Sequence, residues 1–435
     1  MPSQPPRPTR LSVTDLPFYV FLVTLGLCLF RAADLPSLDV GAAGTTLSIG
    51  PADPALLLTA VLAVRELWQR RTVPSPWLLG LTAAFALLIV VSAIPNGADA
   101  VAAAGKLAEF SVLALGAAAF VDTRPRFGIL AGFLVCFCVV AVAWGAVEFV
   151  VNGGERQGAF MGEHDLAALS TMALVLGLAY LFHRDRLPPA VGLVGIAVGT
   201  LGIVLGASLA SVLGLYLAAV AMVALALVRR DLRRRAVVVT VLTCAAVTAG
   251  TYGVRSADLG FLQSWFGPPP ETPGQYASSW SHRLIYVYIG GRVFLDNPIF
   301  GTGWEGELLP PDYAQYLDDA RDRYPDQPPH YFPPETGTLI PQQTFDQVLF
   351  ELGLLGAAVF LVLLVLAVRH AVVAGRRPRP GEPWGEQAYV PLGWLAVMGG
   401  AIAGAALFGG SPLAALFWLT LGVAAIRPAE PEAAA

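Results

Sequence analysis

The chain has 435 residues, of which 56% are hydrophobic and only 13% are charged, and its net charge is −4. Soluble domains carry about 25% charged residues, so this composition excludes a soluble globular protein and indicates a membrane domain. The four cysteines lie in apolar stretches and form neither a disulfide framework nor a zinc pattern.

Twelve apolar stretches are candidates to cross a bilayer as helices, which requires about 20 mostly apolar residues. In chain order they are 16–33, 52–68, 77–94, 100–121, 127–151, 165–183, 189–206, 209–228, 236–254, 341–369, 389–408 and 412–427. We therefore predict an all-α integral membrane protein of about twelve transmembrane helices. The first stretch lacks a small-x-small cleavage site, so we interpret it as an uncleaved helix rather than a signal peptide.

Basic residues recur in every second loop between these stretches. They are Arg7 and Arg10, then Arg65, Arg70 and Arg71, then Arg124 and Arg126, then Arg184 and Arg186, then the run 229–235, and then the group 369–379. Short cytoplasmic loops are rich in Lys and Arg, so we predict that both termini are cytoplasmic. The opposite loops are poor in basic residues except for Arg156, Arg255 and the group 283–323. We expect chemistry near these exceptions.

The longest loop, 255–340, lies between the ninth and tenth predicted helices. It combines proline-rich stretches with many aromatic residues, which a disordered linker would lack. We predict a folded extracytoplasmic cap with helices over 281–295 and 312–324. The chain is thereby divided into nine helices in 1–254, the cap in 255–340, and three helices with a cytoplasmic tail in 341–435.

The cap contains a first candidate site at Arg283, Arg292 and His282. The two arginines are nine positions apart, about two and a half helical turns, and we expect them roughly to share a face. Guanidinium groups grip phosphate oxygens bidentately. Ion pairing with acidic residues of the loop, or contact with lipid headgroups, explains the two arginines equally well.

The short loop 155–165 is a second candidate because it is dense in polar residues and glycine. Arg156 is its most informative residue, since it breaks the charge bias. His164 and Asp165 begin the next helix, and Asp165 also suits a capping or first-turn role.

Two further segments combine polar residues with glycine. The turn 296–304 contains Gly301 and Gly303, which permit unusual backbone angles or close approach, and ends at Trp304. No strand precedes it, so it is not a dinucleotide fingerprint.

The second of these segments, 341–356, begins the tenth helix. Gln343, Asp346 and Gln347 are neighbours on one helical face. Glu351 lies a turn deeper, and we interpret it as part of a helix-to-helix hydrogen-bond network. Lys106 and Glu109 form another predicted structural pair.

These segments, in this order, resemble the O-antigen ligase and O-antigen polymerase superfamily of bacterial membrane glycosyltransferases. The most specific match is 279–304, with Ser-His-Arg-Leu followed by Phe-Leu-Asp-Asn-Pro-Ile-Phe-Gly-Thr-Gly-Trp. Arg156-Gln157-Gly158-Ala159-Phe160 resembles the earlier loop motif, and 342–356 resembles the segment that ends in Glu-x-Gly-x-x-Gly. The resemblance implies a GT-C-like fold in the bacterial cytoplasmic membrane.

The resemblance also implies a reaction outside that membrane. A polyprenyl-diphosphate-linked glycan is the donor, and a glycan or glycolipid is the acceptor. Arg156 and Arg283 would bind the diphosphate, with Arg292, His282, His164, Gln343, Asp346 and Trp304 as further substrate-binding candidates. Membrane lipid is an expected partner, and nucleic acid is not. No cofactor is expected, and no cluster of acids has the spacing of a metal site.

Two positions depart from the family pattern. The ligases usually have a His, which activates the acceptor hydroxyl, where this chain has Gln342, and Gln cannot take a proton. The base would then come from elsewhere, with candidates at His330, Glu335, His282, His164 and Asp346. The Ser-Arg pair that often starts a middle helix reads Ser208-Leu209.

Two other classes of function compete with a glycosyltransferase. A transporter or flippase would have broken helices with polar groups near the midplane, whereas the polar groups here gather at the outer face. A catalytically altered assembly scaffold is the second alternative, because of Gln342.

Overall fold

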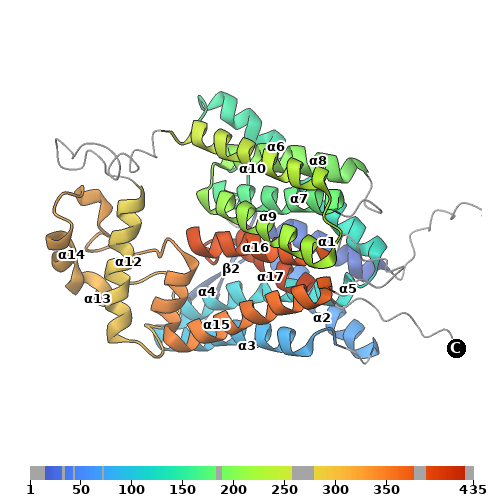
Figure 1. The fold of residues 1–435 in the computed structure, drawn as a ribbon. Coiled ribbons are helices and arrows are strands. Elements are labelled where there is room, and N and C mark those ends of the chain that lie inside the picture. Colours follow the sequence, from blue (N-terminus) through green and yellow to red (C-terminus); the bar gives the residue numbers. More distant parts are fainter. Residues whose placement is uncertain are drawn as a thin grey trace, which may run out of the picture.

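The computed structural model describes residues 15–31, 35–42, 45–70, 73–182, 189–256, 279–376 and 388–426. Its long helices run side by side in a bundle, and a smaller helical unit lies across one end (Figure 1). This smaller unit, residues 279–340, is the described part of the predicted cap. The predicted arginines at 7, 10, 71, 184, 186, 377 and 379, and residues 257–278 of the long loop, lie outside the described residues.

Every predicted apolar stretch contains a helix or a pair of helices. They are α1 (Leu16–Cys28), α2 (Ala52–Arg70), α3 (Pro76–Ser92), α4 (Ala98–Glu109) with α5 (Ser111–Phe120), α6 (Arg124–Val151), α7 (Glu163–Phe182), α8 (Pro189–Gly206), α9 (Leu209–Arg229), α10 (Arg234–Val254), α15 (Thr344–Arg376), α16 (Val390–Gly404) and α17 (Ser411–Ala425). Within the described ranges, seven helical segments are long and apolar enough to cross a membrane, and four shorter apolar helices accompany them. That all twelve stretches cross remains a prediction.

A short β-hairpin interrupts the otherwise helical fold, and the sequence analysis missed it. Strand β1 (Leu38–Ala42) pairs antiparallel with β2 (Thr45–Ile49), with Leu38 opposite Ile49. The segment is too short and too polar to span a membrane, but it contains β-branched residues that favour strands. The predicted helical class holds, and this hairpin is a local exception in the connection between α1 and α2.

Helices α7 and α8 touch along a face made of glycines. A Cβ atom on Gly199 would lie 2.5 Å from the Ser170 carbonyl oxygen, and one on Gly206 would lie 2.6 Å from that of Glu163. Further glycines with contacts as close between the two helices are Gly177, Gly192, Gly195 and Gly202. Small residues permit such close packing in lipid, where no hydrophobic effect drives helices together. The glycine face therefore fixes the end of α8 against the start of α7.

The cap has its own hydrophobic core. Helix α12 (Ser279–Asp296) matches the predicted 281–295, whereas the predicted 312–324 is broken into α13 (Pro310–Tyr313), a 3-10 turn (Ala314–Tyr316) and α14 (Leu317–Arg323). The buried members of the core are Ile285, Ile289, Val293, Leu308, Tyr313, Leu317, Ala320, Phe332, Leu339 and Phe350. Phe350 belongs to α15, so the cap and the bundle share this core.

A kink in α15 receives the turn that follows α12. Gly353 has φ of 61° and ψ of −162°, which interrupts the helix. The amides of Thr302 and Gly303 donate to the carbonyls of Phe350 and Glu351 at 3.1 and 2.9 Å. Gly301 and Gly303 both have positive φ, as predicted for this turn. The turn thereby holds the cap on the bundle.

Candidate functional site

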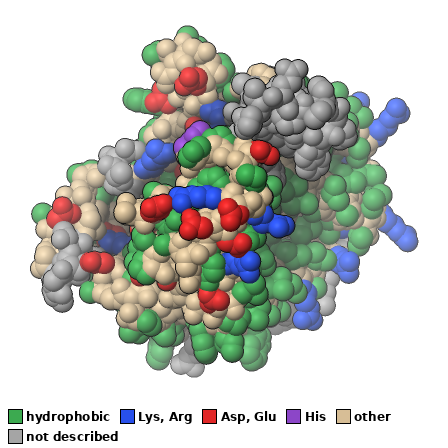
Figure 2. All heavy atoms as spheres, turned by 90° about the vertical axis from the view of Figure 1, so that its left-hand side faces the viewer, with side chains coloured by type: hydrophobic (Ala, Val, Ile, Leu, Met, Phe, Trp, Pro, Cys, Tyr) green, Lys and Arg blue, Asp and Glu red, His purple; other side chains and the backbone are tan. Residues whose placement is uncertain are grey.

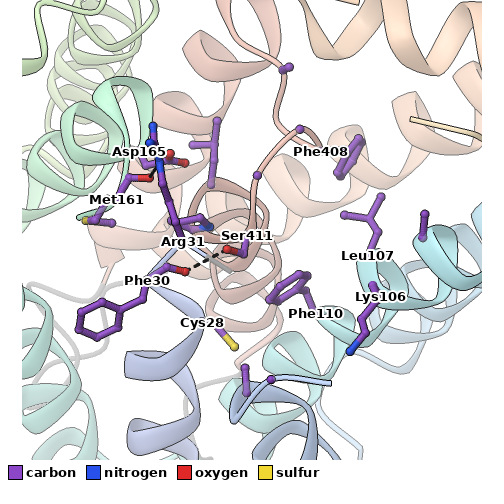
Figure 3. A pocket seen from close by; sticks show the side chains of 18 of the residues that line it. Cys28, Phe30, Arg31, Lys106, Leu107, Phe110, Met161, Asp165, Phe408 and Ser411 are labelled. Carbon is purple, nitrogen blue, oxygen red and sulfur yellow. Dashed lines mark hydrogen bonds between the residues drawn. The ribbon is translucent and has the colours of Figure 1, made fainter. Parts of the chain in front are cut away.

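A cavity of about 920 Å³ opens where the ends of several helices meet under the cap (Figure 3). Arg283, His164 and Gln342 line it, so the structure brings together three residues that the sequence analysis had selected from distant segments. Acidic and basic side chains gather on this end of the molecule, while hydrophobic side chains cover its flanks (Figure 2). The cavity is the strongest candidate for a binding site among the described residues.

Arg283 extends from α12 to the end of α16. Its Nη1 donates to the carbonyl of Gly404 at 3.0 Å, which is the last residue of α16 and has no partner within that helix. Burial lowers the pKa of Arg283 from its usual value, and the nearby charges of Arg255 and Arg156 lower it further, while Asp346 opposes the shift. A guanidinium remains charged in proteins, so Arg283 is a fixed cation here.

Arg156 reaches the end of α8 from its own tight loop. The loop is compact because the amides of Met161 and Gly162 both donate to the carbonyl of Gly158, at 3.0 and 2.9 Å. A Cβ on Gly158 would lie 2.4 Å from the backbone of Gly162, so only glycine fits there. The loop directs Arg156 Nε to the Gly206 carbonyl at 3.3 Å, and its guanidinium also pairs with Glu163.

His164 lies between the positive charges. Its Nδ1 is 2.9 Å from the hydroxyl of Ser208. The charges of Arg156, Arg283 and Arg255 all act on its imidazole. The sequence predicts Arg156 and Arg283 as site residues. Arg255 stands out in the sequence only as an exception to the charge bias.

Another wall of the cavity is formed by Arg31 and Asp165, which lie together in Figure 3. Arg31 Nε donates to the Met161 carbonyl at 2.7 Å, and Asp165 lies in the first turn of α7 as predicted. Lys106 lines the cavity from α4, where its Nζ is 2.5 Å from an oxygen of Asp53. Glu109, the predicted partner of Lys106, lies beside this ion pair. Because Asp53 belongs to α2, the ion pair joins α4 to α2.

Arg292 lies away from Arg283. Its Nη2 contacts Asp319 on α14 at 3.1 Å, and its guanidinium lies over the ring of Tyr288. The expectation of a shared face was wrong, because two and a half turns of an α-helix place two residues on opposite sides. Arg292 therefore stabilises the cap.

The rings of His282 and His330 both contact Tyr331 in the cap. The ring of His282 stacks on Tyr331 with centroids 5.8 Å apart, and that of His330 meets Tyr331 edge-on at 4.7 Å. Burial lowers the pKa of His282, and the charges of Arg283 and His330 lower it further. Glu335, another candidate base, pairs with Arg321 at 3.0 Å.

The segment that leads into α15 brings Gln342 to the cavity, whereas Gln343, Asp346 and Gln347 are not among the lining residues. Gln342 Nε2 donates to the Ile340 carbonyl at 3.2 Å, and the Gln343 carbonyl accepts the amide of Gln347 at 3.1 Å. Asp346 is the carboxylate that acts on Arg283. Thr344 anchors this end to the connection between α16 and α17, because its hydroxyl donates to the Ala405 carbonyl at 2.8 Å.

Trp304 and Glu351 are structural. Trp304 is 2% exposed and packs edge-on against Phe408, so it lies in the core and not on the cavity wall. The fully buried carboxylate of Glu351 accepts the amides of Glu305 and Gly306, both at 2.7 Å. Glu351 is therefore hydrogen-bonded as expected, but its donors are amides of the cap loop and not groups of another helix.

Comparison with known families adds an independent observation. The model of a family described as O-antigen ligase matches residues 191–361, from α8 to the middle of α15. The match contains Arg255, Arg283 and Gln342, while Arg156 and His164 precede it. No curated protein matches the chain. In the described ranges, no group of three or more His, Cys, Asp or Glu residues is placed to hold a metal ion.

Proposed function

Because this multi-pass membrane protein belongs to the O-antigen ligase and polymerase family through residues 191–361, we propose that it transfers or polymerises a polyprenyl-diphosphate-linked glycan at the outer face of the cytoplasmic membrane. The family match indicates a function in membrane glycan assembly. We further propose the donor, the acceptor and the roles of individual residues.

One observation supports the proposal most strongly. Arg283 lines the cavity together with His164, and the charges of Arg156 and Arg283 act on the same imidazole. The leaving group of such a donor is a diphosphate anion. Fixed guanidinium groups stabilise the negative charge that develops as the glycosidic bond breaks.

Asp346 is our candidate for the general base. The acceptor hydroxyl must lose a proton as it attacks the anomeric carbon of the donor sugar, and Gln342 cannot take it. The carboxylate of Asp346 belongs to the first turn of α15 and interacts with Arg283. Gln342 can still accept a hydrogen bond from the acceptor hydroxyl through its amide oxygen and so orient it.

Replacement of Arg283 by Ala tests the proposal. We expect glycan transfer from a polyprenyl-diphosphate donor in proteoliposomes to fall about 10²-fold or more, as when one charge-stabilising donor is lost from an active site. Arg321→Ala is the matched control, because Arg321 pairs with Asp318 and Glu335 on the surface of the cap. Undiminished transfer by a well-expressed Arg283→Ala variant would overturn the proposal.

A further inference from the structure

Arg255 extends the positive cluster in a way that the family resemblance does not assign. It follows the last residue of α10, and only 8% of it is exposed. Its Nη1 is 3.4 Å from the carbonyl oxygen of Ala207. The guanidinium therefore lies at the turn between α8 and α9, next to the site.

Arg255 and Arg156 are held by neighbouring carbonyls of one turn. Arg156 bonds to the carbonyl of Gly206 and Arg255 to that of Ala207. Ala207 has φ of 42°, a left-handed conformation that residues other than glycine rarely adopt. Such strain persists where the surrounding structure requires it. This turn thus accepts a hydrogen bond from each of the two arginines.

Arg283 lies near Arg156 and Arg255. The charges of Arg255 and Arg156 both act on Arg283, and all three act on His164. Arg156 pairs with the carboxylate of Glu163, and Asp346 interacts with Arg283. Three converging guanidinium groups repel one another, and a ligand with several negative charges on adjacent groups relieves that repulsion.

We propose that Arg255 is a third direct ligand of the donor diphosphate, together with Arg156 and Arg283. This inference rests on the proposed function. Leu209, which follows Ser208 on the same turn, carries no charge, and Arg255 brings one to that place from α10. Arg156 and Arg255 hold the diphosphate from the α8 side, and Arg283 holds it from the cap.

The test measures binding of inorganic pyrophosphate to the purified full-length protein in lipid nanodiscs by calorimetry. A charge-assisted hydrogen bond contributes enough that Arg255→Gln should weaken binding about tenfold or more. Arg255→Lys should recover part of this loss, because Lys keeps the charge but not the bidentate fork. Arg321→Gln, on the cap surface, should bind like wild type.

The variants separate this inference from the proposed function. If Arg283→Gln loses pyrophosphate binding while Arg255→Gln binds like wild type, the role of Arg255 is overturned and the function stands. If the wild type does not bind pyrophosphate, or Arg283→Gln binds unchanged, both are overturned. Should Arg255→Gln fail to fold, Arg255→Lys decides, since wild-type affinity in that variant would overturn the inference.

In the transfer assay, Arg255→Gln should raise the donor KM more than it lowers kcat. Loss of a contact made in both the ground state and the transition state changes binding rather than turnover. A fall in kcat alone would contradict direct ligation.

Discussion

Arg156 and Arg283 are anchored in the same way. Each guanidinium donates to the carbonyl of a residue that ends a helix, Gly206 in α8 and Gly404 in α16. The last carbonyls of a helix lack intrahelical partners and carry partial negative charge. An arginine there satisfies a carbonyl with one of its five N–H groups. In the proposed complex, further N–H groups of each guanidinium would contact the diphosphate, although Arg156 also pairs with Glu163.

Substitutions at two residues separate orientation of the acceptor from proton transfer. We expect Asp346→Asn to lower kcat about 10²- to 10⁴-fold, the range for loss of a general base. Gln342→Ala should lower it less than about tenfold, because only a hydrogen bond is lost. The measurement is steady-state transfer at saturating donor, with protein folding checked by size-exclusion chromatography. Equal losses at both positions would remove Asp346 from the role of base.

Single residues differ in how well the sequence predicts them. Arg156 and Arg283 could be selected because they break the charge bias of the loops. Arg283 lines the cavity, and the charge of Arg156 acts on His164, which also lines it. Arg292 was selected together with Arg283. Its spacing of nine positions from Arg283 places it on the opposite side of α12, where it pairs with Asp319. Trp304 was selected as part of a motif, and its burial depends on packing against Phe408, 104 positions later.

At the level of elements, the contact between α7 and α8 determines where two of the arginines are held. The glycines of α8 let it approach α7 closely enough that Gly206 touches Glu163. The sequence shows abundant glycine, but not which helix the glycines face. The same limit applies to Gly353, since only the structure shows that its kink receives the turn after α12.

Gly199→Ala tests this contact. The new methyl group would lie 2.5 Å from the Ser170 carbonyl oxygen, so the helices must separate. Overpacking of this kind costs about 1–3 kcal/mol, and we expect a lower Tm in detergent together with reduced transfer. Gly132→Ala, in α6, is the control because its Cβ would meet no atom within 4 Å. A Gly199→Ala variant as stable as the control would contradict close packing at this position.

At the scale of the whole molecule, the two ends of the bundle are chemically different. One end has the cap, the cavity and the arginine cluster. At the other end, ion pairs tie neighbouring helices together, such as Arg70 with Asp122 at 2.7 Å and Arg126 with Asp15 at 3.0 Å. Apolar stretches of spanning length were enough to predict the helices of the bundle and their order. It could not predict the β-hairpin, which depends on pairing within a short polar connection.

Cysteine labelling tests which end faces outward. In a variant whose four native cysteines are replaced by Ala, Asp318→Cys should react with a membrane-impermeant maleimide in intact cells, because 94% of the Asp318 side chain is exposed on the cap. Arg233→Cys, between α9 and α10, should react only after the cells are permeabilised. The reverse pattern would invert the predicted orientation and exclude an outward-facing site.

The strained turn at Ala207 has a consequence for selectivity. Arg156 and Arg255 bond to the carbonyls of consecutive residues, whose Cα atoms are about 3.8 Å apart. If both arginines hold the diphosphate as proposed, we expect the turn to favour two phosphates joined by one bridging oxygen over anions whose charges lie farther apart.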